Sequence, residues 1–260
     1  MSLSLTAKEK LLPMQAKRIL ILGGTRDARQ LAFRLIHAGH DVTTSFAGVT
    51  EHPIQPEGKV RVGGFGGADG LRHYLQVEKI DVLVDATHPF AAQISANAFD
   101  AAGDVTLLRL ERPAWLERPG DIWLHVADIN AAVAALPDQA VVMLTIGRKE
   151  VAPFMARPDL SGVARMIEPT PIVLPATWSL ILERPPFSLE SEIAVLRDNS
   201  ITHLVSKNAG GGETEMKLVA ARSLQIPVVM IARPNKPAVT TYSSVEGINS
   251  HISKLGSPSG

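Results

Sequence analysis

The sequence is notable first for what it lacks. Its 260 residues include no cysteine, aromatic residues make up only 5%, and the 26 Lys and Arg residues balance the 26 Asp and Glu residues. A chain without cysteine forms no disulfide, no thiolate metal site and no cysteine nucleophile. Zero net charge removes the overall field that would favour a nucleic acid or an anionic membrane surface. No apolar run reaches the roughly 18 residues of a membrane helix. Any charged site must therefore be local.

We expect no signal peptide at the start of the sequence. Residues 1–13 include Lys8, Glu9 and Lys10 without a continuous apolar core, which argues against a signal peptide. We expect them to be an extension without ordered structure, with Met14 as a natural start, and we expect residues 256–260 to be a tail. We expect a cytoplasmic protein that binds neither a membrane nor a nucleic acid.

Short runs of Val, Ile and Leu, each followed by a stretch of helical spacing, dominate the rest of the sequence. This alternation is typical of a buried parallel sheet with crossover helices. The clearest predicted strands are residues 18–22, 41–46, 80–84, 105–110, 140–146, 202–205 and 227–231, with weaker ones at 60–62, 122–126, 163–167 and 178–183. The predicted helices are residues 27–38, 68–77, 90–102, 129–136, 189–199 and 213–224.

This pattern predicts an α/β fold with more strands than one doubly wound sheet usually holds. The segment 112–120 contains three helix and strand breakers, Pro113, Pro119 and Gly120. We therefore predict two α/β domains, residues 14–116 and 117–255, with the chain crossing between them in that segment.

Ligands of open parallel sheets bind beyond the carboxyl ends of the strands, so the residues that follow each strand are informative. Gly23-Gly24-Thr25-Arg26 follows the first strand, where glycines would let the backbone approach a phosphate at a helix start. The full GxGxxG pattern is absent, and a simple tight turn is the alternative interpretation.

The second predicted strand ends in Thr44 and Ser45, without the carboxylate that holds the ribose of NAD. A hydroxyl with a guanidinium nearby, such as that of Arg26, suits a 2′-phosphate instead. If a dinucleotide binds, NADPH is favoured. The alternative is that these are ordinary strand residues without a ligand.

A third strand is followed by Asp85-Ala86-Thr87-His88-Pro89, which combines a carboxylate, a hydroxyl and an imidazole. Pro89 suits the first position of a helix, so Thr87 or His88 capping that helix is one interpretation. The other is that the turn forms the floor of an active site. There it would provide backbone contacts to a cofactor, and His88 would be a catalytic residue that positions the substrate more than it donates a proton.

Basic residues also gather after predicted strands. They are Arg26, Arg112, Arg148, Lys149, Lys207 and Arg233. This clustering indicates an anionic ligand with more charge than a dinucleotide, such as a polycarboxylate. Lys207 and Lys217 flank a loop with three consecutive glycines, but the GxxxxGK[ST] spacing of nucleotide hydrolases is absent. Neither HExxH nor GxSxG occurs, so we expect no metal and no serine nucleophile.

Several of these segments together resemble the precorrin-6A reductases of cobalamin biosynthesis. The segments are 22–29 (LGGTRDAR), 85–91 (DATHPFA), 109–115 (RLERPAW), 145–149 (TIGRK), 206–211 (SKNAGG) and 227–234 (PVVMIARP). The resemblance implies two Rossmann-like domains with mainly parallel sheets and a cleft between them. It also implies NADPH-dependent reduction of a double bond of the precorrin-6A macrocycle, a polycarboxylate tetrapyrrole, to give precorrin-6B.

Carried onto this chain, the resemblance places cofactor and substrate at the strand ends described above. The implied cofactor-binding residues are Gly23, Gly24, Thr25, Arg26, Ser45, Asp85, Ala86 and Thr87. The implied substrate-binding residues are Arg112, Arg148, Lys207 and Lys217, and His88 is the candidate catalytic residue. The pair Arg26-Asp27 departs from the expected Glu-type pair, which puts the phosphate contacts in doubt. Transient contact with neighbouring pathway enzymes is expected.

Two other functions remain open from the residues alone. One is a tetrapyrrole or nucleotide-sugar transferase on two α/β domains, which would oxidise no nicotinamide. The other is a two-lobed small-molecule binding protein, which would need an export signal.

Overall fold

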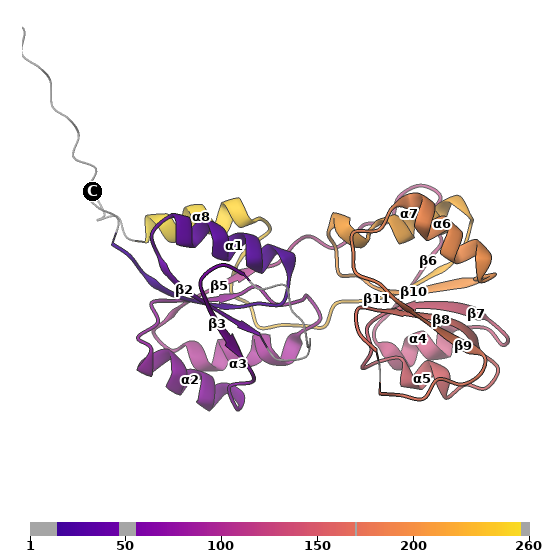
Figure 1. Cartoon of the computed structure of the whole chain (residues 1–260), viewed down its shortest axis with the longest axis horizontal. Helices are drawn as coiled ribbons and strands as arrows, with labels where there is room; N and C mark the ends of the chain where they lie inside the picture. Colours follow the sequence, from indigo (N-terminus) through magenta and orange to yellow (C-terminus); the bar gives the residue numbers. More distant parts are fainter. Residues whose placement is uncertain (1–14, 47–55, 170, 256–260) are drawn as a thin grey trace, which may run out of the picture. The chain divides into compact units, whose positions relative to one another are not determined.

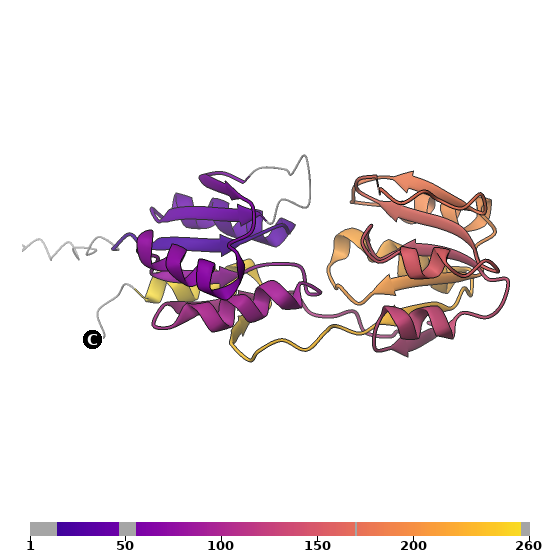
Figure 2. The ribbon, with the colours of Figure 1, turned by 90° about the horizontal axis from the view of Figure 1, so that it is seen from below.

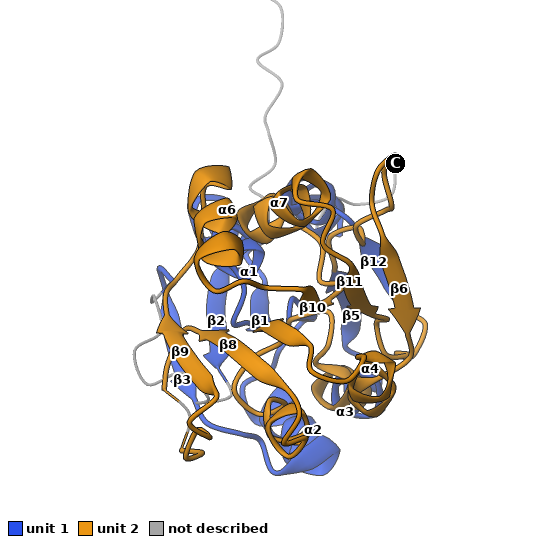
Figure 3. Ribbon diagram, turned by 90° about the vertical axis from the view of Figure 1, so that its right-hand side faces the viewer, with its two compact units in different colours: residues 1–87, 97–110, 239–260 blue, residues 88–96, 111–238 orange. Residues whose placement is uncertain are grey.

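The computed structural model describes residues 15–46, 56–169 and 171–255. The expected extension, residues 1–13, and the expected tail, residues 256–260, lie outside the described residues. The chain forms two compact units. The first comprises residues 1–87, 97–110 and 239–260, and the second comprises residues 88–96 and 111–238 (Figure 3).

The first unit is a six-stranded sheet in the order β12-β5-β4-β1-β2-β3, in which every pairing is parallel. Its strands are β1 (Arg18–Leu22), β2 (Asp41–Phe46), β3 (Lys59–Val62), β4 (Val82–Asp85), β5 (Thr106–Leu110) and β12 (Thr240–Tyr242). Helices α1 (Arg26–His37) and α8 (Val245–Lys254) cover one face, and α2 (Gly67–Val77) and α3 (Ala92–Ala102) lie on the other (Figure 1).

The second unit is another six-stranded parallel sheet, in the order β6-β11-β10-β7-β8-β9. Its strands are β6 (Trp123–Val126), β7 (Val141–Thr145), β8 (Ser161–Met166), β9 (Trp178–Leu182), β10 (His203–Lys207) and β11 (Val228–Ile231). Helices α4 (Ile129–Ala135) and α5 (Ala152–Met155) lie on one face. Helices α6 (Leu189–Asp198) and α7 (Met216–Ser223), preceded by the short helix η1 (Gly212–Thr214), cover the other (Figure 1).

Local sequence explains most of these elements. The central strands β4 and β11 are buried at every position, as expected for strands covered on both faces. Helices α1, α4, α6 and α8 begin after a side chain that caps the first turn, from Thr25, Asp128, Ser188 and Ser244 respectively. The expected α/β class with two Rossmann-like parallel sheets is confirmed.

The C-terminal segment corrects the predicted domain boundaries. Strand β12 pairs with β5, and Val245, Ile248 and Ile252 of α8 pack in the apolar core of the first unit. Figure 2 shows this yellow segment leaving the second unit and running to the first sheet. The prediction of one continuous C-terminal domain over residues 117–255 is therefore wrong, because residues 239–255 complete the first unit.

Both sheets reverse their strand order at one point. In the first unit the reversal lies between β1 and β4, and in the second it lies between β7 and β10. Ligands of doubly wound sheets bind at the carboxyl ends of the strands at such a reversal. The two reversal points therefore mark where to look for function in each unit.

Candidate active site

In the first unit, the turn after β1 is built for close approach of a ligand. Gly24 has a φ of +110°, and a Cβ at this position would have no atom within 4 Å. Gly23 donates a hydrogen bond from its amide to the Ser45 carbonyl at 2.9 Å, and a Cβ on it would come within 2.8 Å of the Thr44 methyl group. Glycine is required at both positions, at Gly24 by its backbone angle and at Gly23 by the neighbouring strand.

Thr25 joins this turn to the end of β4. Its hydroxyl oxygen accepts from the Ala28 amide at 3.0 Å, which caps α1, and its hydroxyl donates to the Ala86 carbonyl at 2.9 Å. The loops after β1 and β4 are thus tied together on both sides of the strand-order reversal. The N-terminus of α1 and an open glycine turn form an anion site of the kind that binds a pyrophosphate.

A guanidinium from the neighbouring strand β3 lies beside the end of β2, and the sequence analysis did not identify it. Ser45 is 5% exposed, and its hydroxyl oxygen accepts from Nη1 of Arg61 at 3.4 Å. Arg61 lies on β3, and Ser45 and Arg61 are register partners in the sheet. Arg26 is the first residue of α1 and is exposed. Arg61 is the guanidinium that contacts Ser45, and the predicted role of Arg26 beside a 2′-phosphate stays a prediction.

A buried ion pair organises the end of β4. Oδ2 of Asp85 accepts from Nε of Arg109 at 3.0 Å, and the two side chains are 1% and 8% exposed. Oδ1 of Asp85 accepts from the Thr87 hydroxyl at 2.6 Å and from its amide at 3.3 Å. Asp85 is neutralised by Arg109, so a carboxylate at this strand end need not repel an anionic cofactor.

In the second unit, cations surround His88. Four of them, Arg112, Lys207, Lys236 and Arg233, act on the His88 imidazole through their charge. Glu111 binds two of these cations, accepting from Arg233 at 3.1 Å and from Lys236 at 2.7 Å, and Glu150 pairs with Lys207. These carboxylates offset part of the charge of the four cations, and such a concentration of basic side chains suits an anionic ligand.

The same cations set the state of His88. Crowding by surrounding protein, followed by repulsion from Arg112, Lys207, Lys236 and Arg233, lowers the pKa of His88 from 6.5 to about 3. The residue nevertheless remains exposed, and solvent screens part of this repulsion. The direction is clear: His88 is neutral at pH 7. Its Nδ1 accepts from the Phe90 amide at 3.2 Å, so the proton lies on Nε2, which is a hydrogen-bond donor.

Two arginines hold the glycine loop that follows β10. Nε of Arg112 donates to the carbonyls of Ala209 and Gly210 at 2.9 Å each, and Arg233 donates to the carbonyls of Asn208 and Ala209. Gly210 and Gly211 have φ values of +69° and +85°. The loop is thus held by hydrogen bonds from the Arg112 and Arg233 guanidinium groups to its carbonyls. The sequence had indicated only an anionic ligand for these two arginines.

The other two predicted substrate contacts, Arg148 and Lys217, have partners within the protein and stay predictions. Nη1 of Arg148 donates to the Pro169 carbonyl at 3.2 Å and lies 3.7 Å from Glu168. Lys217 is 5% exposed, with its ammonium 5.2 Å from the centre of the Trp115 ring. Burial, with Arg165 nearby, lowers the pKa of Lys217 to about 7. Such a lysine is a poor permanent anchor for a carboxylate.

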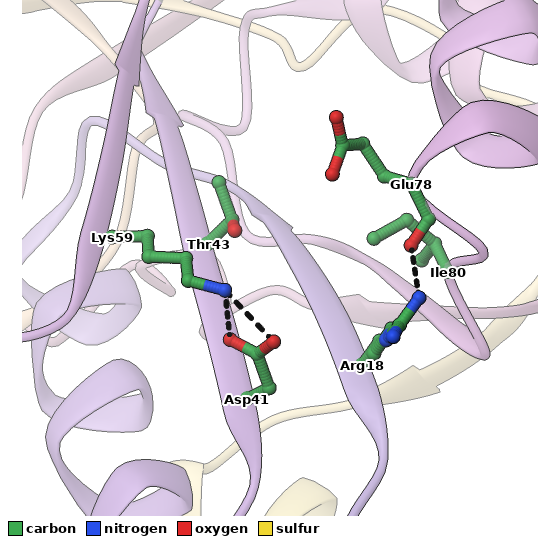
Figure 4. A pocket seen from close by; sticks show the side chains of 6 residues that line it. All are labelled: Arg18, Asp41, Thr43, Lys59, Glu78 and Ile80. Atoms are coloured by element: carbon green, nitrogen blue, oxygen red, sulfur yellow. Dashed lines mark hydrogen bonds and ion pairs between the residues drawn. The ribbon is translucent and has the colours of Figure 1, made fainter.

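A small cavity of about 170 Å³ lies at the opposite edge of the first sheet (Figure 4). Both of its basic side chains are held by oxygen atoms of the protein. Lys59 pairs with Asp41 at 2.9 Å, and Arg18 donates to the Glu78 carbonyl at 3.2 Å. It is lined from the amino ends of β1, β2 and β3, so it is not at a ligand-binding edge.

The described residues contain neither a membrane-spanning helix nor a metal-binding cluster. No helix among them is both long and apolar enough to cross a bilayer. Within the same residues, no three His, Asp or Glu side chains are grouped as a metal ion requires. NADPH, by contrast, fits the first unit, because the open turn at Gly24, the start of α1 and the Ser45–Arg61 pair offer donors for its phosphates.

Comparisons with known proteins agree with this geometry. The family model described as precorrin-6x reductase CbiJ/CobK matches residues 18–253. Precorrin-6A reductase of Rhodococcus erythropolis is 46% identical over 92% of this chain and 98% of its own length. That of Rhodobacter capsulatus is 43% identical over 92% and 97%. A solved structure, CobK precorrin-6A reductase, superposes with a TM-score of 0.87 at 42% identity and covers 93% of this chain and 98% of its own.

Relatives with a different substrate are more distant. Cobalt-precorrin-6A reductase of Priestia megaterium is 31% identical over 88% of this chain and 96% of its own length. The matches span nearly the whole chain and agree with its two-sheet fold. The chain belongs to the precorrin-6A reductase family, a family of NADPH-dependent oxidoreductases of cobalamin biosynthesis.

Proposed function

We propose that this chain reduces a double bond of the precorrin-6A macrocycle with NADPH, giving precorrin-6B. The observation that carries the proposal is the pairing of two different anion sites in one chain. The first unit has a glycine turn, a capped helix start and a hydroxyl–guanidinium pair, which suit a dinucleotide. The second unit has four cations around one neutral histidine, which suit the acetate and propionate groups of a tetrapyrrole.

The protein needs few catalytic groups for this reaction. NADPH, when bound, supplies the hydride to one carbon of the double bond, and the neighbouring carbon gains a proton. In our proposal Gly23, Gly24 and Thr25 bind the pyrophosphate, and the Asp85–Thr87 turn is held in shape by Arg109. The protein then acts mainly by binding and orienting both reactants.

We propose that His88 positions the macrocycle and does not protonate it. Because its pKa is lowered, the imidazole is neutral at pH 7 and its Nε2–H donates a hydrogen bond. Arg112 and Lys207, with Arg233 and Lys236, provide the positive charge around it. Water is a sufficient proton source, since the reduced macrocycle is electron-rich.

Substrate choice and setting are also part of the proposal. The relatives at 43–46% identity are named for precorrin-6A, whereas the cobalt-precorrin-6A reductase of Priestia megaterium is 31% identical. We infer that the cobalt-free macrocycle is the substrate. We place the reaction in the cytoplasm, where NADPH is regenerated, with transient handover of product to the next enzyme of the pathway.

Anaerobic turnover with precorrin-6A, monitored by the loss of NADPH absorbance, tests the proposal.

Lys207→Ala should weaken binding of the macrocycle about 10- to 100-fold, because a charge-assisted contact to a carboxylate is lost. The matched control is Arg197→Ala, which removes an exposed cation from α6 in the same unit. NADPH oxidation that is independent of precorrin-6A would overturn the proposal, and a loss confined to NADPH binding would reassign Lys207.

A further inference from the structure

The loop that follows β10 contains three consecutive glycines, yet it packs closely against another part of the second unit. Gly210 and Gly211 both have positive φ values, and a Cβ on Gly210 would collide with the Pro113 carbonyl oxygen. The loop therefore lies directly on the segment 112–115. Glycine has more backbone freedom to lose than any other residue, so holding such a loop in one conformation requires specific contacts.

Asn208 makes the most specific of these contacts. Its side-chain oxygen accepts from the Trp115 amide at 2.8 Å, and its side-chain nitrogen donates to the Trp115 carbonyl at 3.1 Å. One side chain thus satisfies both backbone groups of a residue that lies 93 positions away in the sequence. The Trp115 indole in turn donates from Nε1 to the Gly211 carbonyl at 3.0 Å. These three hydrogen bonds hold the loop on the segment 112–115.

The two segments that are joined in this way carry cations of the candidate site. Lys207 directly precedes Asn208, and its ammonium lies 5.0 Å from the centre of the Phe90 ring. Arg112 lies in the same segment as Trp115. The two cations can meet one ligand together only if the two segments keep a fixed relative position. Asn208 carries no charge, and both polar atoms of its side chain are bonded to Trp115, so its effect on a ligand passes through its neighbours.

We propose that Asn208 is a positioning residue for the macrocycle, which keeps Lys207 and Arg112 in place by holding the glycine loop on the segment 112–115. The inference rests on the proposed function for the identity of the ligand. With these bonds in place, the loop is ordered before the macrocycle binds, so little backbone freedom is lost on binding. Without them, the macrocycle has to order the loop, and this cost weakens binding with little effect on the reduction step.

Steady-state kinetics of the full chain with NADPH and precorrin-6A test the inference. We expect Asn208→Ala to raise KM for precorrin-6A about 5- to 50-fold and to keep kcat within about threefold, because the reacting groups are unchanged. The affinity for NADPH, measured by titration without the macrocycle, should not change. The variant removes no charge, so the dependence of KM on ionic strength should match that of wild type. Lys207→Ala, by contrast, should weaken this dependence.

A less flexible loop should restore part of the lost affinity. The φ of Gly212 is not positive, and a Cβ on this residue would meet no atom within 4 Å. Gly212→Ala therefore fits the loop and reduces its freedom, so adding it to Asn208→Ala should lower KM again by about 2- to 5-fold. The matched control is Asn199→Ala, which removes an amide that donates to the Val195 carbonyl at the end of α6 and should leave KM unchanged.

Trp115→Phe keeps the test decisive if Asn208→Ala folds poorly. It removes only the indole donor to the Gly211 carbonyl, so KM should rise by about 2- to 10-fold. In both variants, amides of residues 208–212 should exchange faster and those of β7 should not. A fall in kcat at unchanged KM, equal losses for NADPH and precorrin-6A, or a wild-type KM despite faster exchange would overturn the inference.

Failure of the proposed function has a different signature. In that case the wild-type protein does not reduce precorrin-6A at all, whereas failure of this inference leaves wild-type turnover intact and Asn208→Ala equal to it. Hydrogen exchange then still decides whether Asn208 orders the glycine loop, because that measurement needs no macrocycle. Unchanged exchange of residues 208–212 in Asn208→Ala would reject the positioning role whatever the substrate is.

Discussion

At the scale of single residues, Lys217 shows how burial limits what a charged side chain can do. Its ammonium lies inside the second unit against Trp115, and burial, with Arg165 next, lowers its pKa from 10.5 to about 7. The unfolded chain therefore holds this proton more tightly than the folded chain. The free energy of unfolding should rise with pH between about 7 and 10.5.

Replacing Lys217 with Met should remove this cost. We expect Lys217→Met to be more stable at pH 7 by about 1 to 4 kcal/mol, because an apolar side chain needs no desolvation of a charge. The rise in stability toward about pH 10 should flatten in the variant. Urea unfolding at both pH values checks this, with Lys254→Met at the exposed end of α8 as control. A variant less stable than wild type at pH 7 would show that the ammonium has a stabilising partner.

The pKa of His88 is lowered as well, but here the neutral form is the one that the proposed positioning role needs. With its pKa held well below 6.5, the residue should contribute no acidic limb to turnover near that pH. His88→Ala should lower turnover about tenfold through loss of one hydrogen bond, and His88→Gln, which keeps a donor, should lower it less. The pH profile of kcat, measured from about pH 5.5 to 8.5, decides between the two roles. An acidic limb near pH 6.5 that both variants abolish would make His88 the proton donor instead.

At the scale of elements, the returning C-terminal segment is the least local feature of the fold. Ile248 and Ile252 of α8 are 0% exposed and pack in the same cluster as Leu31 and Leu35 of α1. Truncating a buried isoleucine to alanine typically costs about 2 to 5 kcal/mol. We therefore expect Ile248→Ala to destabilise the first unit by that amount.

Hydrogen exchange can assign this loss to one unit. Amides of β1 and β5 in Ile248→Ala should exchange faster than in wild type, and amides of β7 and β10 should change less. Val77→Ala is the matched control, because Val77 is 59% exposed on α2 in the same unit and its truncation should stay within about 0.5 kcal/mol. Equal loss of protection in both sheets would mean that the two units unfold together.

Local patterns were sufficient for most elements but not for this segment. Buried runs such as residues 18–22 and 41–46 were predicted with their observed bounds, because apolar β-branched residues bounded by turns are a local signal. Strand β12 has only three residues, Thr240–Tyr242, and owes its existence to pairing with β5, about 130 positions earlier in the chain. No local pattern in residues 239–255 tells which sheet they complete.

The candidate site shows the same limit. Gly23 and Gly24 come after the predicted strand 18–22, and Asp85 comes after the predicted strand 80–84, so a local pattern indicated all three. Arg61 was missed because its proximity to Ser45 comes from the register between β2 and β3. Glu111 and Lys236, which bind one another at 2.7 Å across 125 positions, were missed for the same reason. The motif 109–115 was a signal for Glu111, since that residue lies within it.

At the scale of the whole molecule, zero net charge coexists with strong local charge. The cations of the second unit and Arg61 of the first are balanced by carboxylates elsewhere on the chain, so composition alone gave no indication of an anionic ligand. Two parallel sheets, each with its own strand-order reversal, allow a dinucleotide and a polycarboxylate to be bound by separate units of one chain. Membership of the reductase family removes the transferase and the binding protein from the alternatives.

The central claim is that this chain transfers a hydride from NADPH to precorrin-6A, and isotope transfer tests it most directly. NADPH carrying deuterium at the transferable position of the nicotinamide is incubated anaerobically with the protein and precorrin-6A, and the product is analysed by mass spectrometry. The account predicts a reduced macrocycle that carries deuterium, with the label retained when the reaction is run in ordinary water. A reduced macrocycle without deuterium, or NADPH consumed with the macrocycle unchanged, would contradict it.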